Sequence, residues 1–280
     1  MTKIFLPKPV AASASAFPDC TLSAALLKIS LSMVLTILLV VSATSAIAKA
    51  PAKSSSKNTV EHMIKPPPSA DLSYTIKAKQ KGLSLTGDAS VQWRASKDQY
   101  SMTSETRAML LGKILDTTSE GSIDAYGLAP SKATEKRFRK KPTNITFDRN
   151  AKRISFSASD AEYPIKGGEQ DRNSAIWQLA TLARSNPNKF KSGALIPMFI
   201  AGQKDADAWK FKVEKSVKIE TKIGNLNAIH LSKIVKNKSE DQQIDIWFAP
   251  SLDWYPIRLR FTEPDGDYIE QTIDKITPQN

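Results

Sequence analysis

Apolar and polar residues alternate along most of the chain from Asp71 onwards. Leu72, Tyr74 and Ile76 begin the pattern, and each is followed by a polar residue. Side chains of a strand point alternately to its two faces, so a period of two is typical of an antiparallel strand with one face buried. The pattern predicts strands at 72–78, 83–95, 100–104, 114–123, 133–138, 144–147, 153–158, 195–200, 209–213, 217–223, 228–235, 243–248, 257–261 and 268–273.

Short turns separate the predicted strands. Residues 148–151, Asp-Arg-Asn-Ala, predict a hairpin loop between two strands, and Asp265-Gly266 predicts a type I′ turn with positive φ at both positions. Consecutive strands joined by short turns form a meander. A sheet of about a dozen strands must curl or split into two layers.

One stretch, residues 171–184, has the period of a helix instead. Its apolar positions follow the i, i+3, i+4, i+7 spacing of a buried helix face, and they are Ile176, Leu179, Ala180 and Ala183. We expect this helix to cover the apolar concave face of the sheet. The predicted fold class is mainly β (α+β): a strongly curved antiparallel sheet, an open or half-barrel of about a dozen strands, covered by one amphipathic helix.

Polar residues at the start of this helix allow two interpretations. With Asp171 as the N-cap, Ser174 occupies position N3, and the carboxylate accepts hydrogen bonds from the first turn. The same side of the helix is also a candidate lining of a ligand cleft, formed by Gln170, Asp171, Ser174 and Gln178. A Ser–Asp pair without a His or Lys base gives no activated nucleophile, so capping is favoured over a hydrolase site.

The aromatic residues divide between core and rim. Trp93, Trp209 and Trp247 fall in predicted strands and are interpreted as core. Trp254 and Tyr255 follow a predicted turn. This pair is a candidate ligand contact for a sugar ring or an acyl chain, and its alternative role is to plug one end of the barrel.

Residues 1–48 are predicted to be a secretory signal peptide, with a start that is unusually long. Lys28 precedes an apolar run from Ile29 to Val41, and small residues follow up to Ala48. A basic start, an apolar core and an Ala-x-Ala end indicate export to the periplasm with cleavage after Ala48. The alternative is an uncleaved segment that anchors the chain to the inner membrane.

Residues 49–70 are predicted to be a disordered linker rich in Ser, Lys and Pro, because nothing in them can bury an apolar face. A single β-rich domain is predicted at 71–276.

The chain is strongly basic. Three Lys and one Asp precede residue 49, which leaves 37 Lys and Arg against 27 Asp and Glu, a net charge of +10. The densest run is Lys136-Arg137-Phe138-Arg139-Lys140-Lys141. Such a surface is attracted to anionic membranes. Its alternative interpretation is a solvated lysine-rich surface, and nucleic acid is not an expected partner of an exported protein.

Familiar catalytic and metal-binding motifs are missing from the sequence. It has no Gly-x-Ser-x-Gly, no phosphate-binding glycine loop and no His-Glu-x-x-His, and its only cysteine is Cys20, inside the leader. The two histidines are His62 in the linker and His230 in a predicted strand. We therefore expect no catalytic residue, no metal and no cofactor.

Several segments together resemble the bacterial "domain of unknown function 3108" family. They run from about Pro66 to Ile273, and they are residues 67–74, Gly127-Leu128-Ala129-Pro130, Gln170-Asp171 with Ser174 and Gln178-Leu179-Ala180, residues 205–209, and residues 247–252 leading to 255–258. The resemblance implies an exported β-rich protein of unknown activity, similar in fold to the half-barrels of periplasmic lipoprotein carriers. It implies no catalytic residues.

These features give one leading functional hypothesis and two alternatives. The first is a non-enzymatic periplasmic protein that binds an apolar or amphiphilic envelope component, such as a lipid, on the concave face of the sheet. The second is an assembly module that pairs with another envelope protein through a sheet edge. The third is a hydrolase at Asp171 and Ser174.

Overall fold

A computed structural model describes residues 63–109 and 111–279, which form one sheet of fifteen strands and one α-helix; the sheet is antiparallel except for one parallel pair of strands at its edge. The predicted signal peptide and residues 49–62 of the predicted linker lie outside the described residues. The strands are β1 (Ala70–Gln80), β2 (Leu83–Ala95), β3 (Gln99–Ala108), β4 (Gly112–Asp124), β5 (Gly127–Arg137), β6 (Thr143–Asp148), β7 (Arg153–Phe156), β8 (Ser159–Pro164), β9 (Gln170–Asp171), β10 (Leu195–Ala201), β11 (Ala206–Thr221), β12 (Gly224–Lys233), β13 (Gln243–Ala249), β14 (Tyr255–Thr262) and β15 (Tyr268–Pro278). The helix α1 spans Arg172–Ser185, and the short 3-10 helices are η1 (Pro187–Lys189) and η2 (Pro250–Leu252).

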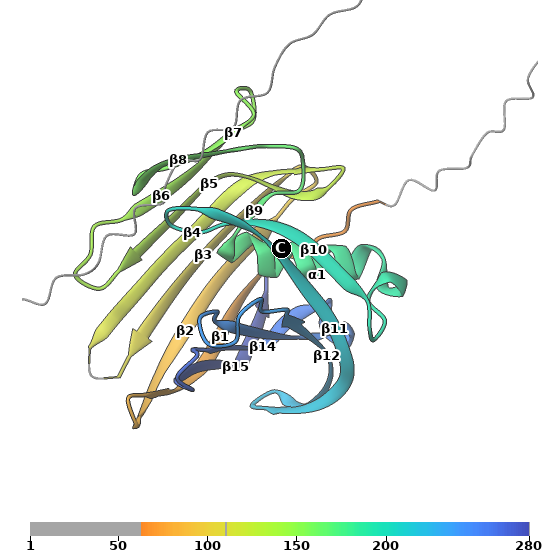
Figure 1. Ribbon diagram of the computed structural model, residues 1–280. Coiled ribbons are helices and arrows are strands. Elements are labelled where there is room, and N and C mark those ends of the chain that lie inside the picture. Colours follow the sequence, from red (N-terminus) through yellow and green to blue (C-terminus); the bar gives the residue numbers. More distant parts are fainter. Residues whose placement is uncertain (1–62, 110, 280) are drawn as a thin grey trace, which may run out of the picture. The chain divides into compact units, whose positions relative to one another are not determined.

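The sheet consists of two meanders, β1–β8 and β9–β15, which are joined by pairing of β1 with β15. Every pair of consecutive strands except β8 and β9 is also paired in the sheet, and the pair of β1 with β15 joins the two halves in the middle. The outer strands β8 and β9 are not paired with each other, and the curled sheet stays open with α1 against its concave face (Figure 1). The predicted class, a curved open sheet covered by one helix, is therefore confirmed.

Strand boundaries differ from the prediction where the chain bends. The strands predicted at 209–213 and 217–223 are one strand, β11, with a bulge between Val213 and Ser216. The strands β8 and β9 were not predicted; β9 has only two residues, which is too few for a period of two to stand out.

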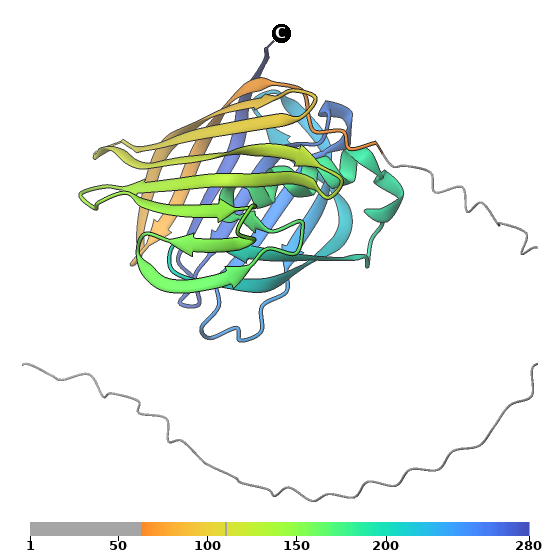
Figure 2. The same cartoon turned by 90° about the horizontal axis from the view of Figure 1, so that it is seen from above.

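The main core lies between α1 and the concave face. Trp177 of the helix stacks on Trp93 of β2, with ring centroids 4.1 Å apart and an interplanar angle of 2°. Seen from above, α1 lies between the first half of the sheet and the second half (Figure 2). Of the other tryptophans interpreted as core, Trp209 and Trp247 are only half-buried.

A second apolar cluster holds the two ends of the sheet together. Met198 and Ile200 of β10 belong to the main core, whereas Phe199 and Ala201 pack with residues of β6 and β7. Alternate residues of one strand point to opposite faces, so β10 has an apolar cluster on each side. The two ends of the open sheet are thus joined by packing of side chains, without a ladder of backbone hydrogen bonds between β8 and β9.

The end of the predicted linker is part of the folded domain. The carbonyl groups of Pro67 and Pro68 accept hydrogen bonds from Trp93 Nε1 at 2.9 Å and from the Tyr255 hydroxyl at 2.8 Å. An extended proline segment leaves its carbonyls free for such bonds. At the other end Gln279 N donates to Ser69 O at 2.9 Å. The domain therefore extends beyond the predicted limits of 71 and 276.

The turn between β14 and β15 is longer than predicted. It covers residues 263–267, with a hydrogen bond from Gly266 N to Glu263 O of 3.0 Å. Only Gly266 has a positive φ, of +87°, so this is not the type I′ turn expected at Asp265-Gly266, which needs two such residues.

Candidate functional site

The start of α1 is a capping box, as the sequence predicts. Asp171 Oδ1 accepts hydrogen bonds from Asn173 N at 2.8 Å and from Ser174 N at 3.1 Å. In return Asp171 N donates to Ser174 Oγ at 3.0 Å. The backbone N–H groups of Asn173 and Ser174, which have no partner within the helix, are thereby hydrogen-bonded. The N-cap assignment of Asp171 is confirmed.

The second carboxylate oxygen of Asp171 ties the helix to the sheet. Ser119 Oγ of β4 donates to Asp171 Oδ2 at 2.6 Å, and the hydroxyl groups of Ser119 and Tyr100 lie 3.0 Å apart. Burial raises the pKa of Asp171, and these hydrogen bonds oppose the rise. Burial, and then the nearby Asp171, raise the pKa of Tyr100.

The two glutamines of the predicted cleft bind the backbone at the start of β5 and in the turn before it. Gln178 Oε1 accepts from Leu128 N at 2.7 Å, and its Nε2 donates to Tyr126 O at 2.6 Å. Gln170 Nε2 donates to Leu128 O at 2.6 Å, while its Oε1 is buried without a hydrogen-bond partner. Gly127, at φ +108°, leaves the space that the Gln178 amide fills.

These four side chains are therefore a structural clamp, which corrects the expectation that they line a cleft. Gln170, Asp171 and Ser174 have no exposed surface, and Gln178 is buried as well. Gln170 and Gln178 bond to the backbone at residues 126–128, whereas Asp171 bonds to Ser119 of β4 and to the first turn of α1, so the buried polar groups find partners inside the fold. The cavity beside Asp171 measures about 20 Å³, room for about one water molecule.

Trp254 and Tyr255 are also internal. The Trp254 ring packs edge-on against Phe190, with centroids 6.1 Å apart, and Tyr255 packs edge-on against Trp177 at 6.3 Å. Burial, and then the nearby Asp253, raise the pKa of Tyr255 to about 12. Both side chains are buried, at 8% and 5% exposure, so the pair does not stand at an open rim.

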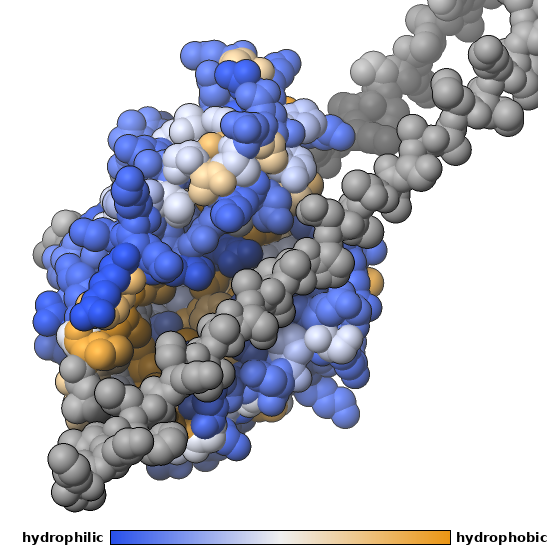
Figure 3. Space-filling model, turned by 60° about the vertical axis from the view of Figure 1, so that its left-hand side comes forward, coloured by the Kyte–Doolittle hydropathy of each residue, from blue (hydrophilic) through white to orange (hydrophobic). Residues whose placement is uncertain are grey.

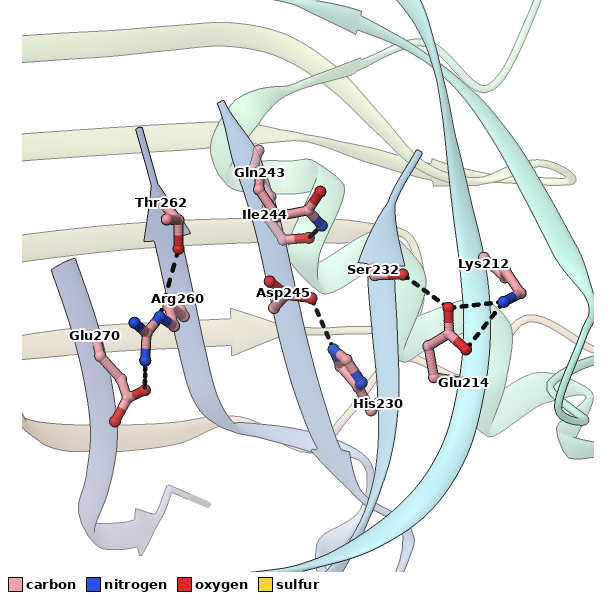
Figure 4. Close-up of polar contacts among 10 residues, drawn as sticks. All are labelled: Lys212, Glu214, His230, Ser232, Gln243, Ile244, Asp245, Arg260, Thr262 and Glu270. Atoms are coloured by element: carbon pink, nitrogen blue, oxygen red, sulfur yellow. Dashed lines mark hydrogen bonds and ion pairs between the residues drawn. The ribbon is translucent and has the colours of Figure 1, made fainter. Parts of the chain in front are cut away.

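The convex face carries a Ser, a His and an Asp that do not form a catalytic triad. His230 Nε2 and Asp245 Oδ1 are 2.8 Å apart. Ser232 Oγ instead donates to Glu214 Oε1 at 3.1 Å, and its side chain points to Glu214 in the close-up (Figure 4). The hydroxyl is thus not directed at a histidine base. No group of three metal-ligating His, Cys, Asp or Glu side chains occurs in the described residues.

An apolar hollow opens at the end of the sheet far from Trp254. Figure 3 brings this side forward and shows apolar side chains inside a hollow between hydrophilic walls. One row of inward-facing residues crosses five neighbouring strands in register, Leu85, Ala78, Ile269, Phe261 and Ile244. They share a face with the core because each lies an even number of positions, two or four, from a buried residue of its own strand.

Exposure rises steadily from the core to the mouth of this hollow. Ile246 is 1% exposed and Ile76 6%. At the mouth, Leu85 is 38% exposed, Ile269 44% and Leu83 66%. The hollow consists of these three residues and the half-buried Ala78 and Phe261 between them. Apolar side chains that face inward yet meet water are the feature of this molecule that suits an apolar ligand.

The size of the helix explains why the hollow is not filled. β2 has 13 residues and so is about 43 Å long, whereas a helix with its side chains is about 10–12 Å wide. The helix contacts β4, β5 and β14 from within the curve and can cover only part of their length. Sequence reasoning identified Leu83 and Leu85 as strand residues but did not identify them as a site. The difference between the length of the strands and the width of the single predicted helix could have indicated that part of the concave face stays uncovered.

Three solved structures are similar to the chain at low levels. A candidate exported protein with a YmcC-like fold from Bacteroides fragilis is 6% identical with a TM-score of 0.33, covering 77% of this chain and 99% of its own. A candidate lipoprotein from Parabacteroides distasonis is 8% identical with a TM-score of 0.29 and the same two coverages. A LolA superfamily protein from Nitrosomonas europaea is 9% identical with a TM-score of 0.20, covering 79% of this chain and 90% of its own. TM-scores this low carry no argument about this chain.

No curated protein sequence matches the chain significantly. The family model described as "Protein of unknown function (DUF3108)" matches residues 73–274. This range runs from β1 into β15 and includes the capping box, both glutamines of the clamp and the whole hollow. The chain therefore belongs to the domain of unknown function 3108 family.

Proposed function

We propose that this protein is a non-enzymatic envelope protein that holds the apolar part of an amphiphile, such as an acyl chain, in the hollow. The observation that carries the proposal is the row of inward-facing apolar residues that stays exposed at the mouth, above all Leu83, Leu85 and Ile269. Water in contact with such a concave apolar surface is displaced favourably by an apolar chain.

The walls of the hollow suit a ligand with both apolar and polar parts. The apolar row lies on β2, β1, β15, β14 and β13. Thr106 of β3 and Thr117 of β4 face the same side, since they lie four positions from Met102 and two positions from Ser119, and both are buried next to the apolar row. Burial of each CH₂ group contributes about 0.8 kcal/mol, so about eight buried methylenes would contribute about 6 kcal/mol before ordering costs.

The proposed location is the periplasm. The predicted signal peptide, with cleavage after Ala48, would deliver the domain there in soluble form. Without cleavage the same segment would anchor it to the inner membrane. Among the described residues no helix is long and apolar enough to span a membrane.

The alternative of pairing through a sheet edge receives less support. β8 is an outer strand of the sheet, and it contains Asp160, Glu162 and Pro164. Charged residues and proline are the usual protection of an edge strand against pairing. The hydrolase alternative requires Asp171 and Ser174 in an open cleft, whereas both side chains are fully buried.

Binding of a dansyl-labelled fatty acid, followed by fluorescence, tests the proposal. Leu85→Glu places a charge in the hollow and is expected to weaken binding at least about tenfold, because the carboxylate would lose water on ligand entry. Leu195→Glu is the matched control, since Leu195 is 54% exposed at the start of β10, away from the hollow. Equal binding by the wild type and Leu85→Glu, with both folded by circular dichroism, would contradict the proposal.

A further inference from the structure

Three hairpin turns, each with exposed apolar side chains in it or next to it, lie along the edge of the sheet at the mouth of the hollow. They contain residues 81–82 between β1 and β2, residues 109 and 111 between β3 and β4, and residues 138–142 between β5 and β6. Alternate turns of an antiparallel meander lie at the same edge, so these three loops stand side by side. Met109 N donates to Thr86 O at 3.1 Å, and Phe138 N donates to Ile114 O at 2.8 Å, which links each loop to its neighbour.

The apolar side chains at this edge are among the most exposed in the described residues. Met109 is 77% exposed, Leu83 66%, Leu111 60% and Phe138 41%. They occupy separate hairpins, and neighbouring hairpins are about 10 Å apart because each contributes two strands at about 4.8 Å. The apolar groups are thus spaced points and not one continuous patch.

Basic side chains surround these points. Lys81, Lys136, Arg139, Lys140 and Lys141 are all exposed in or beside the three loops. None of the five has an ion pair to a described residue, whereas Lys113 and Arg107 are paired with Glu105. The Arg139 guanidinium lies 4.8 Å from the ring centroid of Phe138, so one cation and one apolar tip share a single loop.

We propose that this edge, called here the basic rim (Leu83, Met109, Leu111, Phe138, Arg139, Lys140 and Lys141), docks onto the surface of an anionic lipid bilayer. Separate apolar side chains can each enter the headgroup region of a fluid bilayer, while the anionic headgroups bind the basic side chains between them. Charge complementarity selects the occupant, because the free charges of the rim are all positive. Docking would direct the mouth of the hollow towards the membrane, but it does not depend on what the hollow binds.

The neighbouring loop gives the surface a direction. Residues 263–267, between β14 and β15, contain Glu263, Asp265 and Asp267, and Lys81 N donates to Asp267 Oδ2 at 2.8 Å. These carboxylates are repelled by anionic lipid. The molecule would therefore tilt so that the loops of β1–β6 approach the bilayer and the loop after β14 stays in water.

Co-sedimentation with vesicles tests the proposal, using the chain from Lys49 onwards, which contains the whole described domain. We expect binding to vesicles of phosphatidylcholine with 30% phosphatidylglycerol (about the anionic share of a bacterial membrane), at least about tenfold weaker binding without the anionic lipid, and loss of binding between 0.1 M and about 1 M salt. The paired variant Arg139→Glu/Lys140→Glu and the variant Met109→Ser/Leu111→Ser are each expected to lose at least about tenfold in affinity.

Matched controls lie at the opposite edge and on β10. Lys97→Glu changes a lysine in the loop between β2 and β3, and Leu195→Ser removes an equally exposed leucine. Both controls should bind vesicles like the wild type. Equal loss in rim variants and controls, or no binding of the wild type to anionic vesicles, overturns the proposal, and so does wild-type affinity in both rim variants.

The dansyl fatty acid assay separates this proposal from the function of the hollow. Rim variants should keep wild-type affinity for the soluble probe, because none of the four substituted residues belongs to the hollow. Leu85→Glu should lose the probe and keep the vesicles. Loss of both activities in every rim variant would mean a damaged fold and would count against a separate docking surface.

Discussion

The contact between Gly127 and Gln178 can be tested by a double-mutant cycle. A Cβ on residue 127 would lie 2.3 Å from Gln178 Oε1 and 2.6 Å from its Nε2, and φ at this position is +108°. Gly127→Ala therefore strains the backbone by about 2 kcal/mol and displaces the amide. The displaced amide leaves Leu128 N–H and Tyr126 C=O without partners, which costs about 3 kcal/mol for the two.

The double variant should be less destabilised than the two single variants together. Gln178→Ala alone costs about 3 kcal/mol and Gly127→Ala about 5 kcal/mol, but the double variant also costs about 5 kcal/mol, because the same two hydrogen bonds are lost only once. The coupling energy is then about 3 kcal/mol. Urea unfolding followed by circular dichroism measures all four corners of the cycle.

The melting temperature gives a second reading of the same cycle. For a domain of this size about 1 kcal/mol corresponds to about 2–4 °C, so Gly127→Ala should melt about 10–20 °C below the wild type. Additive losses, with a double variant near 8 kcal/mol by the sum of these estimates, would refute the view that residue 127 must be glycine to admit the Gln178 amide.

The remaining predictions concern the clamp, the core and the proline segment. Asp171→Ala should cost about 1–2 kcal/mol or more, whereas Asp171→Asn keeps an acceptor for the first turn and should cost less, as measured by thermal unfolding. Burial raises the pKa of Asp171 above its value in the unfolded chain, so this residue should make the free energy of unfolding fall as pH rises from about 4 through the raised pKa. Asp171→Asn should remove this pH dependence, as measured by urea unfolding at several pH values. Trp177→Ala removes the stack on Trp93 and should cost about 3–5 kcal/mol; a loss under 1 kcal/mol would contradict its central place in the core. Trp93→Phe leaves Pro67 O without its donor and should raise proteolysis before β1, measured by limited digestion.

The sequence predicted the fold class because its evidence is local. The alternation around Leu72 and Tyr74 and the helical spacing of Leu179 and Ala183 each arise within one element. Asp171 and Ser174 form a capping box from residues three positions apart. Such features depend little on the tertiary setting, so the helix, its N-cap and most of the predicted strands agree with the structure, whereas β8, β9 and the continuity of β11 were missed.

The candidate site was beyond this reach. Gln170, Ser174 and Gln178 carry the polar groups that a ligand cleft also uses, and only the position of the β5 loop decides that they bind backbone. Trp254 could have stood at a rim or inside, and the packing of Phe190 against it determines that it is inside.

By itself the sequence determined the periods of two and 3.6 residues, the helix cap, the basic charge and the absence of familiar catalytic motifs. Only the tertiary structure decided where apolar residues meet water. Leu85 and Val91 have the same phase in one strand, yet Leu85 is 38% exposed and Val91 8%. Their difference comes from the width and position of a helix about 80 residues away in the chain, which covers one end of the strands and leaves the other end open.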